Sequence, residues 1–134
     1  MEYIEGLSLS NSLSVYEMYK RRESEKVYMK VTKQIIEAVQ HLHINEVSHM
    51  NINPHNIKMR HPFLPLDQNE IVLVNLDDLC LYNPKFNLQS GNLGKKLKET
   101  IYMAHEIINP LDEMTTNKCI TINSAIDVFS IGVL

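Results

Sequence analysis

The most regular hydrophobic pattern in the chain runs from Ser24 to about Asn45. Apolar residues recur there at steps of three and four positions, and this spacing lines them along one face of a helix: Val27, Val31, Ile35, Ala38, Val39 and Leu42. The Ser24 hydroxyl can accept a hydrogen bond from a first-turn N–H group, and Asn45 is a suitable stop. The pattern therefore predicts a helix that buries its apolar face in a core.

Two short runs rich in β-prone residues follow, Ile57 to Met59 and Ile71 to Val74. The proline-bearing stretch from His61 to Glu70 separates them, which predicts a β-hairpin with a long loop. The stretch from Asn83 to Glu99 combines glycines with a lysine cluster, so we expect a polar loop with some helix. Asn109 to Ile122 has no clear periodicity and is predicted to be irregular.

The octapeptide His49-Met50-Asn51-Ile52-Asn53-Pro54-His55-Asn56 resembles the catalytic loop of protein kinases, H-R-D-L-x-x-x-N. In that family the Asp accepts the proton of the substrate hydroxyl, and the last Asn holds a metal ion. Pro54, three places after Asn51, is closer to the serine/threonine branch of the family than to the tyrosine branch.

Other kinase landmarks follow the same order along the chain. They resemble the hinge between the two lobes, the helix before the catalytic loop, the strand into D-F-G, the A-P-E segment and the buried helix after it: Met1 to Gly6, Gln34 to His43, Ile71 to Asp77, Ile101 to Glu106 and Asp127 to Val133. The resemblance implies a mainly α fold with a small β-hairpin (α+β), part of a kinase-like C-lobe. All 134 residues form one partial domain in this interpretation, with the N-lobe and the C-terminal helices absent.

The same resemblance implies that the catalytic side chains have been replaced. Asn51 stands at the position of the catalytic Asp, and an amide cannot take a proton as a carboxylate does. Asn53 matches the catalytic-loop Lys, so a positive charge is lost. At the metal positions, Asn56 matches the family residue, whereas Asn75 replaces the Asp of D-F-G with a weaker ligand. Asp77 lies two residues further, roughly 6 to 7 Å along a strand, which is too far to take over.

The nucleotide-binding positions are also altered. The resemblance gives Glu2, Ile4 and Lys58 as the remnant positions for contacts to the cofactor. Strand alternation puts Lys58 on the face that lies under the adenine ring in kinases, where its charged head must reach solvent or a partner. None of the four glycines lies in a G-x-G-x-x-G frame. We therefore expect no bound cofactor.

Structural positions are better kept than chemical ones. By resemblance, Asp127 accepts hydrogen bonds from the backbone of the catalytic loop and ties that loop to the core. His41 and His43 are two residues apart on the predicted helix and point in different directions, so they cannot chelate one metal. We expect surface histidines or core histidines with hydrogen-bond partners instead.

Charge and composition exclude several classes of function. The net charge of -3 gives no basic field for nucleic acid or an anionic membrane. No apolar run reaches the roughly 18 residues of a membrane-spanning helix, and no signal sequence follows Met1. Cys80 and Cys119 form no C-x-x-C pair and are expected to be thiols. We expect an intracellular protein, cytoplasmic or nuclear.

Three functional hypotheses follow. The first is a catalytically inactive serine/threonine-kinase-like module that binds another protein, such as a kinase or a kinase substrate. The second is a divergent serine/threonine kinase, using ATP and Mg²⁺, of which this is an incomplete chain. The third is a truncated remnant with no folded function.

Overall fold

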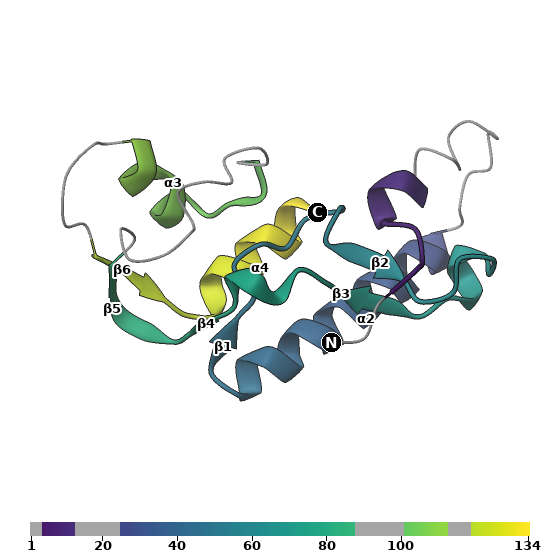
Figure 1. Ribbon diagram of the computed structural model, residues 1–134, viewed down its shortest axis with the longest axis horizontal. Coiled ribbons are helices and arrows are strands. Elements are labelled where there is room, and N and C mark those ends of the chain that lie inside the picture. The colour runs from purple at the N-terminus through teal and green to yellow at the C-terminus, as the bar shows by residue number, and fades with distance from the viewer. Residues whose placement is uncertain (1–3, 13–24, 88–100, 113–118) are drawn as a thin grey trace. The chain divides into compact units, whose positions relative to one another are not determined.

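The computed structural model describes residues 4–12, 25–87, 101–112 and 119–134. These residues belong to two compact units (Figure 1). The first unit comprises Met1–Ala38 and Pro54–Val74, and the second comprises Val39–Asn53 and Asn75–Leu134. No helix in the described ranges is both long and apolar enough to cross a membrane.

Helix α2 (Glu25–Ile44) confirms the predicted helix. Its first part belongs to the first unit and its last part to the second. Val27, Val31, Ile35 and Val39 are buried, as the periodicity predicts, and Ala38 and Leu42 are half-buried. Asn45 ends the helix: its backbone N–H donates to the Leu42 carbonyl at 3.0 Å, and its side-chain amide donates to the His41 carbonyl at 2.8 Å. The predicted cap, Ser24, lies outside the described residues.

The first unit contains the predicted hairpin. Strand β2 (Ile57–Met59) pairs antiparallel with β3 (Ile71–Leu73), with Ile57 opposite Leu73. The connecting stretch holds a short 3₁₀ helix, η1 (Leu66–Gln68). Ile57 and Met59 are buried and Lys58 is not, which confirms the alternation.

One polar side chain of α2 fastens the hairpin to that helix. The Gln34 carbonyl oxygen accepts from the Ile71 N–H at 2.9 Å, and its amide nitrogen donates to the Asn69 carbonyl at 3.3 Å. Asn69 in turn orders the loop, because its amide donates to the carbonyls of His61 and Leu64 at 2.7 and 2.9 Å. The long loop is therefore held by side-chain to backbone hydrogen bonds.

The segment from Ile4 to Ser8 runs beside β2. The Met59 N–H donates to the Leu7 carbonyl at 3.0 Å, and Ser8 forms an antiparallel bridge with Lys58. Gly6 lies so close to the Met59 carbonyl that a Cβ atom there would overlap the oxygen. Only glycine allows this approach.

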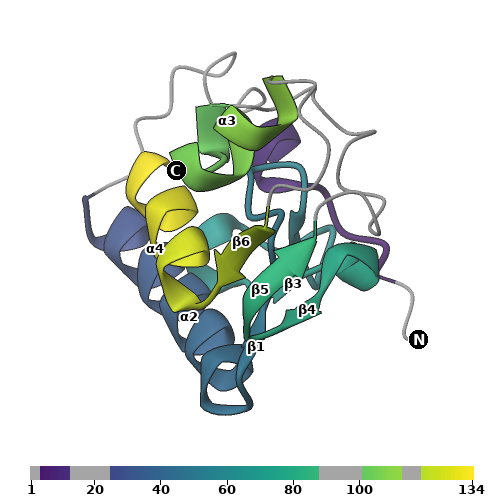
Figure 2. The ribbon, with the colours of Figure 1, turned by 90° about the vertical axis from the view of Figure 1, so that its left-hand side faces the viewer.

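Among the described residues, the second unit contains two short sheets and, besides the end of α2, two α-helices. Strand β1 (Val47–Ser48) pairs with β4 (Cys80–Leu81), and β5 (Asn83–Asn87) pairs with β6 (Cys119–Ile122), both antiparallel. Helices α3 (His105–Asp112) and α4 (Ser124–Val133) complete it, with α4 following β6 directly (Figure 2). The core cluster consists of five buried residues: Met50, Ala104, Ile107, Ile122 and Ile126.

The fold class, mainly helical with a small hairpin, is confirmed, but two predictions about irregular segments are wrong. Strand β5 lies at the start of the predicted polar loop, and β6 with the end of α3 lies in the segment predicted to be irregular. These two strands stabilise each other by pairing across more than 30 residues of sequence, and local periodicity does not report such pairing. The rest of the predicted loop, residues 88–99, lies outside the described residues.

We predict that Gly6→Ala destabilises the chain by about 1–3 kcal/mol, because the added methyl group must push the Met59 carbonyl away. Gly132→Ala is the matched control, since a Cβ atom at Gly132 meets nothing within 4 Å. Urea unfolding of both variants measures the difference. Equal stability of the two variants would show that the close approach at Gly6 is not required.

Candidate functional site

Asp127, in the first turn of α4, holds the backbone of residues 49–53, the catalytic-loop-like turn. Its carboxylate is fully buried. Oδ2 accepts from the His49 N–H at 2.7 Å, and Oδ1 accepts from the Met50 N–H at 2.9 Å. The role that the kinase resemblance implies for this residue is confirmed.

The backbone that these two hydrogen bonds hold is strained at Met50. Met50 has a φ of 68°, in the left-handed region that a residue with a long side chain rarely adopts. Such a conformation costs on the order of 1–3 kcal/mol and persists only where neighbouring contacts determine it. Here the Asp127 carboxylate fixes the N–H groups of His49 and Met50, and the Met50 side chain is buried in the core cluster.

His43, in the last turn of α2, is a third partner of Asp127. Its Nε2 lies 2.9 Å from Asp127 Oδ2, and because an ionised carboxylate only accepts, the histidine donates. The ring also lies against Tyr82, with 6.1 Å between the two centroids. His43 is therefore a core histidine with a hydrogen-bond partner, one of the two outcomes expected from the sequence, while His41 is exposed. Three donors to a single buried carboxylate offset much of the cost of burying its charge.

Asn51 and Asn53 are brought together in a chain of hydrogen bonds that ends on a carboxylate. The Asn53 side-chain amide donates to Asn51 Oδ1 at 2.7 Å. The Asn51 amide then donates to Asp78 Oδ2 at 2.8 Å. Because the carboxylate can only accept, it fixes the orientation of the Asn51 amide, and this orientation fixes that of Asn53.

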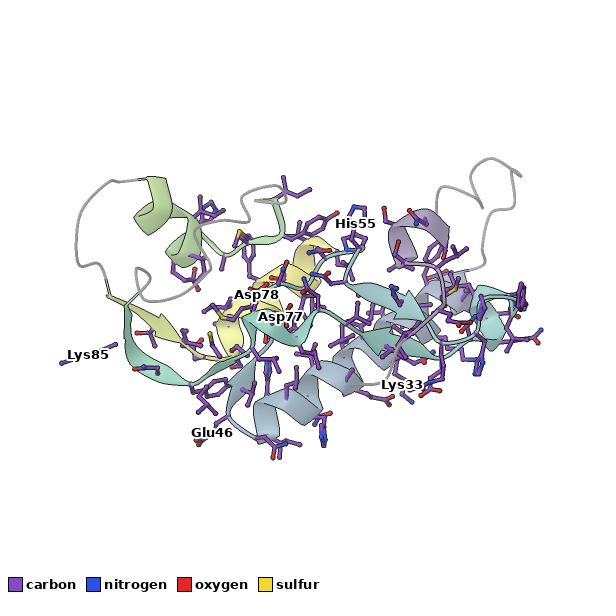
Figure 3. The ribbon with its side chains drawn as sticks, in the orientation of Figure 1. Lys33, Glu46, His55, Asp77, Asp78 and Lys85 are labelled. Carbon is purple, nitrogen blue, oxygen red and sulfur yellow. The ribbon has the colours of Figure 1, made fainter. Side chains whose placement is uncertain are left out.

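Asp78 was missed by the sequence reasoning, which considered only its neighbour Asp77. The 3₁₀ helix η2 (Leu76–Asp78) turns the chain so that Asp78 is buried against the catalytic-loop-like turn while Asp77 is exposed (Figure 3). Asn75 precedes η2 in the left-handed conformation, with a φ of 63°, which asparagine tolerates better than most residues. The adjacent pair Asp77 and Asp78 was the signal in the sequence. Strand alternation, however, places only Asp77 on the same face as Asn75.

Cys80 lies next to this network and is half-buried. Burial raises the pKa of its thiol, and the negative charges of Asp78 and Asp127 raise it further. The neutral thiol is therefore the favoured form, which is unlike a reactive cysteine.

The remaining predicted site residues are distributed between the two units. In the first unit, Lys58 Nζ donates to the Ile4 carbonyl at 3.0 Å, so these two positions are brought together. Asn56 also belongs to the first unit, and its backbone carbonyl accepts from the Val74 N–H at 2.9 Å. Asn75 belongs to the second unit. Glu2 lies outside the described residues.

Metal-binding groups are not gathered in the described part of the chain. Within those residues, no three His, Cys, Asp or Glu side chains are placed to hold one ion. The residues at the two metal positions of the family, Asn56 and Asn75, offer neutral amide oxygens, which Mg²⁺ and Ca²⁺ favour less than carboxylates.

A family model of the protein kinase domain matches residues 1–134. The chain belongs to the protein kinase family. Probable serine/threonine-protein kinase 2 of Plasmodium falciparum is 26% identical over 135 residues, which cover 100% of this chain and 22% of that protein. Serine/threonine-protein kinase PrkC of Bacillus subtilis is 33% identical over 61 residues, which cover 46% of this chain and 9% of that protein.

A solved structure has the same fold. "Titin kinase and its flanking domains" matches with a TM-score of 0.68 and 20% identity, covering 98% of this chain and 20% of that chain. The chain thus spans about a fifth of the length of its P. falciparum relative and of this structural neighbour. Membership of the kinase family accounts for the hydrogen bonds that Asp127 accepts from the N–H groups of His49 and Met50.

We predict that His43→Leu destabilises the chain by about 1–3 kcal/mol, because Asp127 loses a donor in a buried site. His41→Leu, two residues earlier on the same helix, is exposed and should change the stability by less than about 0.5 kcal/mol. Thermal unfolding followed by circular dichroism compares the two variants. Similar losses for both would mean that the hydrogen bond between His43 and Asp127 contributes nothing.

Proposed function

We propose that this chain is a catalytically inactive, serine/threonine-kinase-like module that acts inside the cell by binding another protein, such as a kinase or a kinase substrate. The observation that supports this most strongly is the hydrogen-bond chain from Asn53 through Asn51 to Asp78. It engages both ends of the Asn51 side chain at the position where a kinase needs a base.

A catalytic base must present a basic oxygen to the hydroxyl group of the substrate. The only oxygen of the Asn51 side chain already accepts from Asn53, and the nitrogen is a donor. An amide oxygen has no useful basicity even when it is exposed. The lysine position is held by the neutral Asn53, so the charge that would stabilise the transferring phosphate is also lost.

Apolar side chains on the surface support the part of the proposal that concerns binding to another protein. In the second unit, Val128 of α4 is 58% exposed, and Leu81 and Ile101 are 72% and 67% exposed. Large apolar side chains that face water are available for contact with another protein. A kinase-like scaffold without the catalytic side chains is suited to such a role.

The second candidate is a divergent serine/threonine kinase, which would use ATP and Mg²⁺ and of which this is an incomplete chain. Asp78 is the observation that favours it, because its carboxylate lies within hydrogen-bond distance of Asn51. A carboxylate at that place could accept a proton in the manner of a general base. The names of the two curated relatives agree with this class.

We predict no transfer of radiolabelled phosphate from ATP to a generic protein substrate with either Mg²⁺ or Mn²⁺, and no thermal shift on addition of ATP with metal. Asn51→Asp with Asn75→Asp should not restore transfer, because the uncharged Asn53 remains. Labelling by the unmodified chain that is lost in Asp78→Asn would contradict the proposal and favour the divergent kinase. Asp77→Asn, on the exposed neighbour, is the matched control.

A further inference from the structure

Lys58 turns its charged end toward the protein rather than toward water. Its Nζ donates to the Ile4 carbonyl at 3.0 Å, and the residue is half-buried. A lysine in the middle of a short strand commonly extends its ammonium into solvent, as exposed Lys85 of β5 does (Figure 3). Lys58 therefore makes a specific contact.

Backbone contacts fix both ends of this contact. The Met59 N–H donates to the Leu7 carbonyl, and Ser8 forms a bridge with Lys58 itself. Gly6 touches the Met59 carbonyl with no room for a side chain between them. Since the segment from Ile4 to Ser8 cannot move away from β2 without breaking these contacts, the ammonium and its acceptor stay close together.

Ile4 and Lys58 are also two of the three positions at which the family resemblance places the contacts to the nucleotide base. We propose that Lys58 closes this position, an arrangement that we call the lock. Its ammonium donates to the Ile4 carbonyl, and its carbon stem fills the space that an adenine ring would need. The proposal deepens the proposed function, on which it rests, by naming the residue that closes the nucleotide site.

The energetic reason is that adenine would have to displace the ammonium. The half-buried ammonium would lose the Ile4 carbonyl as its acceptor, and the face of a stacked purine ring offers no lone pair in its place. Removing the charge while keeping the length of the side chain should open the position. Lys58→Met does this, because methionine is unbranched, flexible and apolar.

The first experiment measures the binding of adenosine, without metal, by ligand-observed NMR. We expect no binding by the unmodified chain at millimolar adenosine. Lys58→Met should bind adenosine with a dissociation constant at least about tenfold below the limit set by the unmodified chain, a difference of about 1.4 kcal/mol. Lys85→Met, on the exposed lysine, should behave like the unmodified chain. Equal adenosine binding by the unmodified chain and Lys58→Met, or by neither, overturns the lock.

A second experiment uses only the unmodified chain, so it decides the question even if Lys58→Met does not fold. Acylation of lysines by an N-hydroxysuccinimide ester is followed by peptide mass spectrometry. Lys58 should react at least about tenfold more slowly than Lys85 in buffer, since its nitrogen is hydrogen-bonded and the residue is half-buried, and at a similar rate in urea. Equal rates in buffer overturn the lock.

The two proposals fail separately. Adenosine has no phosphate to transfer and the assay contains no metal, so its binding reports on the lock alone. Phosphate transfer by the unmodified chain would contradict the proposed inactivity, whatever the reactivity of Lys58.

Discussion

The structure of the second unit depends on the carboxylate of Asp127. It is fully buried, and it gathers the N–H groups of His49 and Met50 and the ring of His43. Through these bonds it joins the last turn of α2 and the nearby catalytic-loop-like turn to α4, which lies 77 to 84 residues further along the chain. Removing one donor from such a buried carboxylate typically costs about 1–3 kcal/mol, a large share of the stability of a small domain.

Asp127 bonds only to backbone groups of the loop, so the loop conformation does not depend on the side chains at the catalytic positions. Asp127 imposes the left-handed conformation at Met50 through backbone groups, which every residue except proline supplies in the same form. The side chains at Asn51 and Asn53 are then free to change without loss of the turn. Their amides bond to each other and to Asp78, so these polar side chains have hydrogen-bond partners. The chain therefore keeps the conformation of the loop with amide side chains at these two positions.

Sequence reasoning predicted the elements whose signal is local. The helix and the hairpin follow from periodicity and β-propensity, and the role of Asp127 follows from the resemblance to protein kinases. The pairing of β5 with β6 was missed because each strand is stabilised by a distant partner. Asp78 was missed because a 3₁₀ turn, and not strand alternation, decides which carboxylate points inward. The contact between Lys58 and Ile4 could be foreseen only as a need for some partner, since the sequence does not show which carbonyl lies within reach.

Amide hydrogen exchange at His49 and Met50 tests the central claim most directly, in the unmodified chain and in Asp127→Asn. The asparagine keeps the volume of the side chain but replaces one acceptor oxygen with a donor nitrogen. We predict slow exchange of both amides in the unmodified chain and exchange at least about tenfold faster in Asp127→Asn, a loss of about 1.4 kcal/mol or more. Fast exchange in the unmodified chain, or rates that Asp127→Asn leaves unchanged, would contradict this account.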